Sequence, residues 1–347
     1  MGITGDYFDT LQLHAARLSM VAAVTIAGVM AATWTPQAGA APDSVQPNQS
    51  PKDLVDALHA AFGEHHARAV HAKGVILEGT FMADPGAKAL SKAPIFASGR
   101  LPVTVRFSNF TGIPDIPDNI PEANPRGFAV KIKSSDGEAF DVVTHSFNGF
   151  PTSNSDEFAA LLRSVGASGP DAEHPTPVER FLSTHPIAKT FLTTQKPPPM
   201  SYATAAYFGV NSLKFTNNGG KAIYVRYRFV PHAGEHYLSP EEAKANGPEY
   251  LQKELPQRIA KGPLVFDWYA QIAAPGDKID DPSIAWPERR RLAKLGTLTI
   301  TTVADDAETK DKHTLFLPGT PHSGIEAADP MLTLRTTAYP ISFGARQ

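Results

Sequence analysis

The sequence predicts an α+β fold, in which an antiparallel β-barrel is flanked by helices. Its strand-like segments are joined mostly by short turns rather than by helical crossovers, a pattern that favours antiparallel pairing. The clearest hairpin is LKFTNNGGKAIYVRYRFV, which has NNGG at the bend and places Ile223, Val225, Tyr227 and Phe229 on one face. The 31 proline and 26 glycine residues among 347 also suit a β-rich protein with many loops better than a helical bundle.

An apolar run, LSMVAAVTIAGVMAATW, occupies residues 18–34 and follows Arg17. The small residues AGA at 38–40 match the cleavage rule of secretory signal peptides. We therefore expect residues 1–40 to be removed and Ala41 to begin the mature protein. The alternative is an uncleaved membrane anchor, because the run is at the lower limit of a span. The sequence predicts an exported, periplasmic protein, with no stable membrane span once the signal is cleaved.

The mature chain is expected to form one domain over residues 51–347, after a flexible polar leader at 41–50. A helix is expected to begin at Pro51 and to run along PKDLVDALHAAFGEHHARAV, in which Leu54 and Leu58 belong to one apolar face. The other expected helices lie at 155–165, 175–193 and 240–259.

Alternation of apolar and polar residues marks the strands. In RLPVTVRFSNF, Val103, Val105 and Phe107 point one way, and the polar face carries Arg106 and Ser108. The other segments expected to be strands are HAKGVILEGTF, RGFAVKIK, FDVVTHSF, FDWYAQIA and GTLTITTV.

The segment ADPMLTLRTTAYPISF carries a helix start, with Asp329 at the N-cap and Pro330 at the first helical position. A helix places Arg335 and Tyr339 on one face, one turn apart, and Pro340 limits its continuation. A guanidinium beside a phenol favours the phenolate, an anionic oxygen that suits ferric iron and is one of the known haem ligands. The alternative is a surface cation–π contact between the same two side chains.

The chain contains no cysteine, which excludes disulfides, thiolate metal sites, iron–sulfur clusters and cysteine nucleophiles. Its net charge of −3 provides no basic field for phosphates, so no nucleic-acid partner is expected. Adjacent His65 and His66 project from different faces of a helix, and His232 and His236 lack an evident third ligand. We assign both pairs to the surface rather than to a zinc site.

Several segments, in chain order, resemble the haem catalases, and specifically the compact catalase-related peroxidases. RAVHAKG resembles the segment that carries the distal histidine, and LPVTVRFSN and PRGFAVKIKSSDGEAFDVVTHSF resemble the strands that follow it. YFGVNSLKFTNNGGKAIYVRYRF is similar to the long barrel hairpin, and DDPSIAWPERR and LGTLTI to the wrapping segment and a late strand. DPMLTLRTTAY supplies R-x-x-x-Y, the proximal signature. The resemblance extends from about Pro51 to Arg346 and implies the catalase barrel.

The resemblance implies a role for each matched residue on the distal side. His71 is the distal acid–base group, and Ser108 is the hydroxyl beside it. Arg68 and Arg106 become partners of the haem propionates, because a guanidinium fork suits a carboxylate.

On the other side of the cofactor, the resemblance makes Tyr339 the iron ligand and Arg335 the residue that keeps it ionised. Phe158 matches the aromatic residue that covers the haem in larger relatives. The implied cofactor is haem b with an axial tyrosinate.

The chain departs from the large catalases in one distal residue and in size. Their distal asparagine falls within the segment that this chain writes as DVVTHSFNGF. An alignment of Asp141 and Phe158 without a gap places Ser146 there, with Asn148 two residues late. If Ser146 faces the haem, His145 faces away from it. The helical C-terminal domain and the long N-terminal arm of larger members are also missing.

The implied function is a haem-dependent peroxidase that reduces hydrogen peroxide or organic peroxides with a small organic electron donor, and so protects against peroxide stress. Weak catalase activity is expected beside it, and the oligomeric state is left open between monomer and dimer. The alternatives are a true catalase, an isomerase of fatty-acid hydroperoxides in the same pocket, and an exported haem carrier without turnover.

Overall fold

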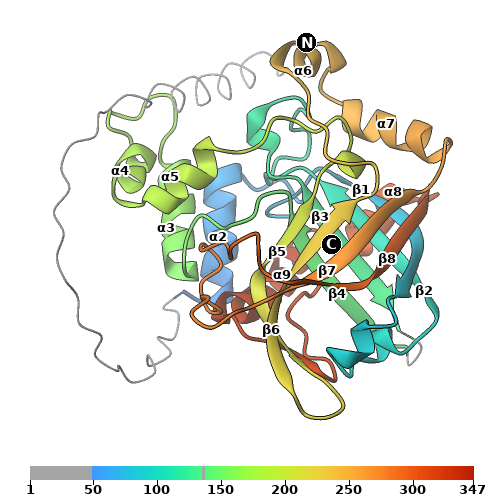
Figure 1. Ribbon diagram of the computed structural model, residues 1–347. Helices are drawn as coiled ribbons and strands as arrows, with labels where there is room; N and C mark the ends of the chain where they lie inside the picture. The colour runs from blue at the N-terminus through green and yellow to red at the C-terminus, as the bar shows by residue number, and fades with distance from the viewer. Residues whose placement is uncertain (1–48, 135–136) are drawn as a thin grey trace, which may run out of the picture.

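The computed structural model describes residues 49–134 and 137–347, and it combines helices with strands that all pair antiparallel (Figure 1). The strands follow the order β4-β3-β2-β1-β8-β7-β6-β5-β9, and β4 also pairs with β5. They are β1 (Gly74–Ala83), β2 (Arg100–Ser108), β3 (Gly127–Lys133), β4 (Ala139–His145), β5 (Tyr207–Thr216), β6 (Ala222–Pro231), β7 (Leu264–Ile272), β8 (Leu292–Val303) and β9 (Ile325–Ala327). Strands β1 to β8 therefore close on themselves, which confirms the predicted antiparallel barrel.

The barrel closes through one pair of residues, His145 of β4 and Phe208 of β5. Elsewhere the ladders are long; β1 and β2, for example, stay in register from Gly74↔Ser108 to Met82↔Arg100. The seam between β4 and β5 is thus the barrel pairing with the fewest paired residues.

Aromatic side chains fill the barrel. Trp268 and Phe229 stack with ring centroids 5.6 Å apart, and Phe107 and Phe128 stack at 5.0 Å. Val103, Val105 and Phe107 belong to this core, as the alternation in β2 predicts. The alternate residues of β2, which include Arg106 and Ser108, face the outside of the barrel, where the helices pack.

The helices cover one side of the barrel and one end of it (Figure 1). They are α2 (Pro51–Phe62), α3 (Ser155–Gly166), α4 (Pro177–Thr184), α5 (Pro186–Thr193), α6 (Pro240–Asn246), α7 (Tyr250–Ile259), α8 (Ala307–His313) and α9 (Pro330–Gly344). Short 3-10 turns lie at Ala87–Ala89, Pro94–Phe96, Pro121–Ala123 and Tyr202–Thr204. Helices α2, α3 and α9 form one group, because α2 packs against both of the others.

Three of the predicted helices were too long. The helix from Pro51 ends at Phe62, because Gly63 adopts a φ of 86°. The predicted helix 175–193 is divided at His185, since the residue before a proline avoids the helical region. The predicted helix 240–259 is divided by Gly247, at a φ of 80°, and the proline that follows it.

The last helix, α9, was predicted to stop at Pro340 and does not. It continues to Gly344 with Pro340 inside it. The proline removes one backbone hydrogen bond, to the carbonyl of Thr336, but the helix runs on past it. Its predicted start is confirmed, because the Asp329 side chain caps it by accepting from the backbone N–H of Met331 at 2.9 Å.

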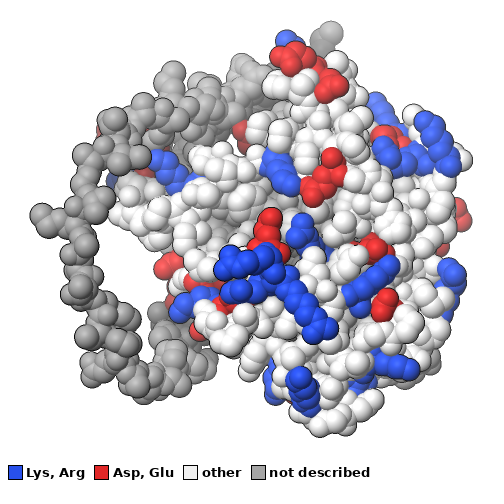
Figure 2. All heavy atoms as spheres, viewed as in Figure 1, with Lys and Arg blue, Asp and Glu red and all other residues white. Residues whose placement is uncertain are grey.

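The predicted signal peptide and most of the leader lie outside the described residues. Among the residues that the structure describes, no helix has both the length and the apolar character needed to cross a bilayer. On the face shown in Figure 2, basic and acidic side chains are interspersed over a largely uncharged surface.

Candidate active site

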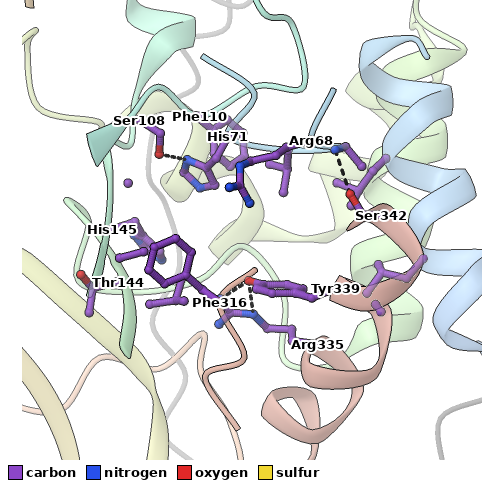
Figure 3. A pocket seen from close by; sticks show the side chains of 18 of the residues that line it. Arg68, His71, Ser108, Phe110, Thr144, His145, Phe316, Arg335, Tyr339 and Ser342 are labelled. Atoms are coloured by element: carbon purple, nitrogen blue, oxygen red, sulfur yellow. Dashed lines mark hydrogen bonds between the residues drawn. The ribbon is translucent and has the colours of Figure 1, made fainter. Parts of the chain in front are cut away.

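A cavity lies between the outer face of strands β2, β3 and β4 and the helices α2, α3 and α9. It encloses about 1280 Å³, its open mouth included, and its walls are mainly apolar. The predicted site residues that line it are Arg68, His71, Arg106, Ser108, Phe158, Arg335 and Tyr339. Segments that are far apart in the sequence thus meet at one site (Figure 3).

His71 lies between α2 and β1 in a conformation that is rare for its residue type. Its φ is 58°, in the left-handed region. The backbone there is held by the N–H of His71, which donates to the carbonyl of Phe110 at 2.8 Å, and by Arg106, which donates to the carbonyl of His71 at 2.8 Å. Such strain persists only where the surroundings impose it, and it concentrates at functional sites.

Hydrogen bonds fix the proton on the His71 ring. Nδ1 lies 2.9 Å from the carbonyl oxygen of Asn109 and 3.1 Å from Oγ of Ser108. A carbonyl can only accept, so Nδ1 carries the proton and Nε2 is a free base. Burial, with the nearby Arg106 guanidinium, lowers the pKa of His71 to about 3 and keeps the ring neutral.

Gly127 of β3 makes room for this histidine. A Cβ at position 127 would lie 2.3 Å from Oγ of Ser108 and 2.7 Å from Nδ1 of His71. Any larger residue would displace the ring, so Gly127 belongs to the site although no sequence pattern indicated it. Only the register of β2 and β3, which sets Ser108 opposite Gly127, reveals its importance.

Tyr339 lies across the cavity from His71 (Figure 3). Arg335, one turn earlier on α9, donates to the phenolic oxygen from Nη2 at 2.7 Å and from Nε at 3.3 Å. The pairing predicted from the sequence is therefore present, with two guanidinium donors on one oxygen. The guanidinium also donates to the side-chain oxygen of Asn211, whose amide donates to Asp329 at 2.7 Å. This chain of contacts fixes the direction in which Arg335 points.

A cluster of arginines borders the cavity. Arg68 and Arg106 both bind Asp311 of α8, at 2.8 Å and 2.6 Å. The two residues expected to hold cofactor carboxylates thus already hold a carboxylate of the chain itself. Arg346, which was not predicted from the sequence, joins them by donating to the carbonyl of Thr314 at 2.9 Å. Arg346 lies just past the end of α9, and its spacing of seven residues from Tyr339 was the signal that could have identified it.

The electrostatics of this cluster favour further anions. Burial and the neighbouring Arg106 lower the pKa of Arg68 to about 9, and burial lowers the pKa of Arg346 to about 10. Burial opposes the ionisation of Asp311, but Arg106 and Arg68 outweigh it and lower the pKa of its carboxyl. Within the described ranges, Arg68 and Arg106 bind this one carboxylate and Arg346 lies close enough to feel its charge, which leaves a surplus of two positive charges at the rim of the cavity.

The predicted orientation at the end of β4 is wrong. Ser146 does not line the cavity; its Oγ accepts the backbone N–H of Arg126 at 2.8 Å. His145, which was expected to face away, lines the cavity instead. The reason is register: His145 pairs with Gly127, which pairs with Ser108, and residues directly opposite each other share one face of a sheet. An alignment without a gap could not show this.

Phe158 lies where an aromatic cover was expected. It projects from α3 into the cavity wall, and its ring lies 4.8 Å from that of Phe150. Phe191 of α5 extends the same aromatic wall, with its ring 6.4 Å from that of Phe150.

These features together fit a flat apolar cofactor with a dianionic edge and a metal at its centre. The apolar walls would cover its faces, and the surplus positive charge at the rim would suit two carboxylates. The oxygen of Tyr339, which accepts from Arg335, is of a kind that suits ferric iron. Two residues that line the cavity each have a buried nitrogen atom, Nε of Arg68 and Nε2 of His145, without a hydrogen-bond partner within the described part of the chain. Buried polar atoms rarely lack a hydrogen-bond partner, and a bound group would supply one for each of these atoms.

Comparisons with known proteins agree with this interpretation. The sequence profile of the catalase family matches residues 58–346. A catalase-related peroxidase of Mycolicibacterium paratuberculosis is 36% identical over 302 residues, which are 86% of this chain and 95% of that protein. Another, from Synechococcus elongatus, is 30% identical over 331 residues, 93% of this chain and 95% of that protein.

Solved structures give the same fold. Catalase A from Saccharomyces cerevisiae superimposes with a TM-score of 0.71 at 21% identity, over 81% of this chain and 61% of that one. The chain thus spans less than two thirds of the yeast enzyme, whereas it spans nearly all of the two catalase-related peroxidases. Catalases in general bind haem. This chain belongs to the catalase family, as an oxidoreductase of the peroxidase and catalase type that acts on peroxide.

Proposed function

We propose that this protein is a haem b peroxidase that reduces hydrogen peroxide or organic peroxides with a small organic electron donor. The observation that carries the proposal is the placing of a neutral base, Nε2 of His71, across one cavity from the arginine-supported oxygen of Tyr339. A base on one side and a metal ligand on the other are two groups that would serve peroxide cleavage at a haem.

In this proposal the chain's own residues hold the cofactor and move one proton. Tyr339 would hold the iron through its phenolic oxygen, and Arg335 would keep that oxygen anionic through its two hydrogen bonds. Arg68, Arg106 and Arg346 would hold the propionates, and the first two also bind Asp311. His71 takes a proton from one peroxide oxygen and returns it to the other, work that contributes about 10²–10⁴ in rate. Bound haem iron supplies the oxidising chemistry.

Similarity supports a peroxidase rather than a true catalase, because the chain is 36% and 30% identical to two catalase-related peroxidases over nearly their whole length. The expected loss of the distal asparagine to Ser146 gives no further support, since Ser146 lies outside the cavity. We keep weak catalase activity as part of the proposal.

Export remains part of the proposal as well. Support comes from the apolar run at 18–34 and the small residues at 38–40. The N-terminal sequence of the protein recovered from cells tests it: Ala41 as the first residue supports cleavage, and an intact N-terminus contradicts it.

The deciding experiment is the absorption spectrum of the haem-reconstituted protein, taken before and after hydrogen peroxide, beside Tyr339→Phe and His71→Ala. We expect a high-spin ferric spectrum that Tyr339→Phe alters. Peroxide should change the wild-type spectrum, and guaiacol should restore it faster than further peroxide does. Faster restoration by peroxide itself would instead indicate a true catalase.

His71→Ala separates an enzyme from a haem carrier. This variant should still load haem, and it should lose most of its reaction with peroxide. A wild-type protein that loads haem and ignores peroxide would contradict the proposed enzyme, and a failure to load haem would contradict the proposed cofactor.

A further inference from the structure

His145 occupies a defined place in the distal wall. Ser108, Gly127 and His145 are consecutive partners across β2, β3 and β4, so all three present the same face to the cavity. Gly127, in the middle, has no side chain, and the ring of His71 lies over it. The row therefore places Ser108 on one side of His71 and His145 on the other (Figure 3).

The surroundings of His145 fix its proton as firmly as those of His71, but on the opposite nitrogen. The backbone N–H of Phe147 points at Nδ1 from 3.3 Å, so Nδ1 accepts. Burial, with the Arg335 guanidinium, lowers the pKa of His145 to about 3, and the ring is neutral. In a neutral imidazole whose Nδ1 accepts, Nε2 must carry the proton. His145 is thus a hydrogen-bond donor in the wall of the cavity.

The donor has no partner within the chain. Nε2 of His145 is buried, and it makes no hydrogen bond in the part of the chain that the structure describes. The rings of Phe150 and Phe191 lie beside the imidazole, with centroid distances of 6.5 Å and 6.3 Å, and neither ring offers a hydrogen-bonding N or O atom. A buried N–H in the wall of an apolar cavity is destabilising when it has no acceptor, which implies that an acceptor arrives from outside.

The two histidines are complementary. His71 presents a bare nitrogen and His145 presents an N–H, so a hydrogen peroxide molecule between them meets one acceptor and one donor. Each peroxide oxygen carries a proton to give and lone pairs to accept with. A single base orients one end of such a molecule, whereas a base and a donor together orient both.

We propose that His145 is a positioning residue for peroxide, and that its Nε2–H donates a hydrogen bond to the substrate oxygen while His71 accepts the proton. This proposal rests on the proposed function. It adds a second distal histidine to the site and assigns it no proton transfer of its own, because its Nδ1 faces a backbone N–H and its only proton is the one that it donates.

Fluoride is a suitable probe, because the bound anion accepts hydrogen bonds and undergoes no reaction. We would measure its dissociation constant for the haem-loaded full-length protein and for His145→Leu and His145→Gln. The leucine variant should bind fluoride about tenfold more weakly, and glutamine, which restores an N–H, should recover most of the loss. His232→Gln, the same exchange on the exterior beside Asp267, is the matched control and should bind as the wild type does.

A second measurement does not depend on haem. Nitrogen-15 NMR of the apoprotein reports which imidazole nitrogen carries the proton, and we expect Nε2 for His145 and Nδ1 for His71. A His145 proton on Nδ1, or unchanged fluoride binding in His145→Leu, would overturn the inference.

The two proposals fail in different ways. If the wild-type protein reacts with peroxide and His145→Leu reacts and binds fluoride equally well, only the role of His145 is lost. If the wild-type protein itself binds no haem or ignores peroxide, the proposed function is lost, whatever the NMR spectrum shows.

Discussion

The proximal and distal sides of the cavity use different kinds of backbone. Tyr339 and Arg335 stand one turn apart on a regular helix, so their contact follows from helical spacing alone. His71 stands on a left-handed residue in a loop, and His145 stands on the last residue of a strand. Their meeting depends on three strands in register and on a glycine between them. One side is therefore secured by local structure and the other by long-range packing.

That difference predicts where a small change does most damage. Gly127→Val should slow the reaction of the haem-loaded protein with peroxide by about 10²-fold, the lower end of what a positioned base contributes, because the new side chain displaces His71. Stopped-flow mixing with hydrogen peroxide measures the rate. The control is Gly99→Ala, since a Cβ at Gly99 meets no atom within 4 Å. A Gly127→Val protein that reacts at the wild-type rate would show that the distal side tolerates displacement as well as the helix does.

On the proximal side, the corresponding change removes a contact without moving the backbone. Arg335→Leu takes two donors from the phenolic oxygen, a loss of about 2 kcal/mol for hydrogen bonds to a charged group. Haem should therefore leave the variant at least tenfold faster, which transfer to an excess of apomyoglobin measures. The helix itself should remain, and its far-UV circular dichroism should be unchanged. An unaltered rate of haem loss would remove Arg335 from the proposed ligand site.

The distal side should also respond to acid. Burial lowers the pKa values of His71 and His145 from 6.5 to about 3. Below pH 6.5 both rings are therefore protonated in the unfolded chain but stay neutral in the folded chain, which binds two fewer protons there. Burial raises the pKa of Asp329 to about 6, so the folded chain holds one extra proton between that pH and 3.8, the ordinary value. The difference is about one proton, and the free energy of unfolding should fall by about 1.4 kcal/mol per pH unit from pH 6 to 4.

Urea denaturation of the apoprotein at several pH values measures this slope. His145→Phe removes one of the two histidines that take up a proton on unfolding. The free energy of unfolding of this variant should therefore change little with pH over the same range. A wild-type curve that is already flat would mean that the two rings are protonated in the folded protein.

The smallest expected effect concerns the strained residue itself. His71→Gly should be more stable than His71→Ala by about 1 kcal/mol, because glycine adopts a φ of 58° without the cost that a Cβ brings. The two variants lose the same imidazole, so the difference in their free energies of unfolding isolates the backbone. Equal stabilities would indicate that the loop relaxes once the ring is gone.

Sequence patterns predicted whatever depends on local spacing. The barrel, the inward face of β2 and the pairing of Arg335 with Tyr339 all follow from periods of two or four residues. Prediction failed where partners are distant in sequence. That His145 rather than Ser146 faces the cavity follows only from the register of the strands. That Asp311 binds the arginines at the rim follows only from the position of α8. The helix breaks at His185 and Gly247 do have a local sequence signal, namely the proline after His185 and the glycine itself.

The single pair that closes the barrel has a consequence for hydrogen exchange. His145↔Phe208 joins β4 to β5, whereas β7 and β8 are joined over most of their length. Opening at the seam breaks few hydrogen bonds, so its amide protons should exchange with deuterium earlier than those of the other barrel strands. Because His145 also lines the cavity, a cofactor bound there should slow this exchange, and the protection of one amide would report the filling of the pocket.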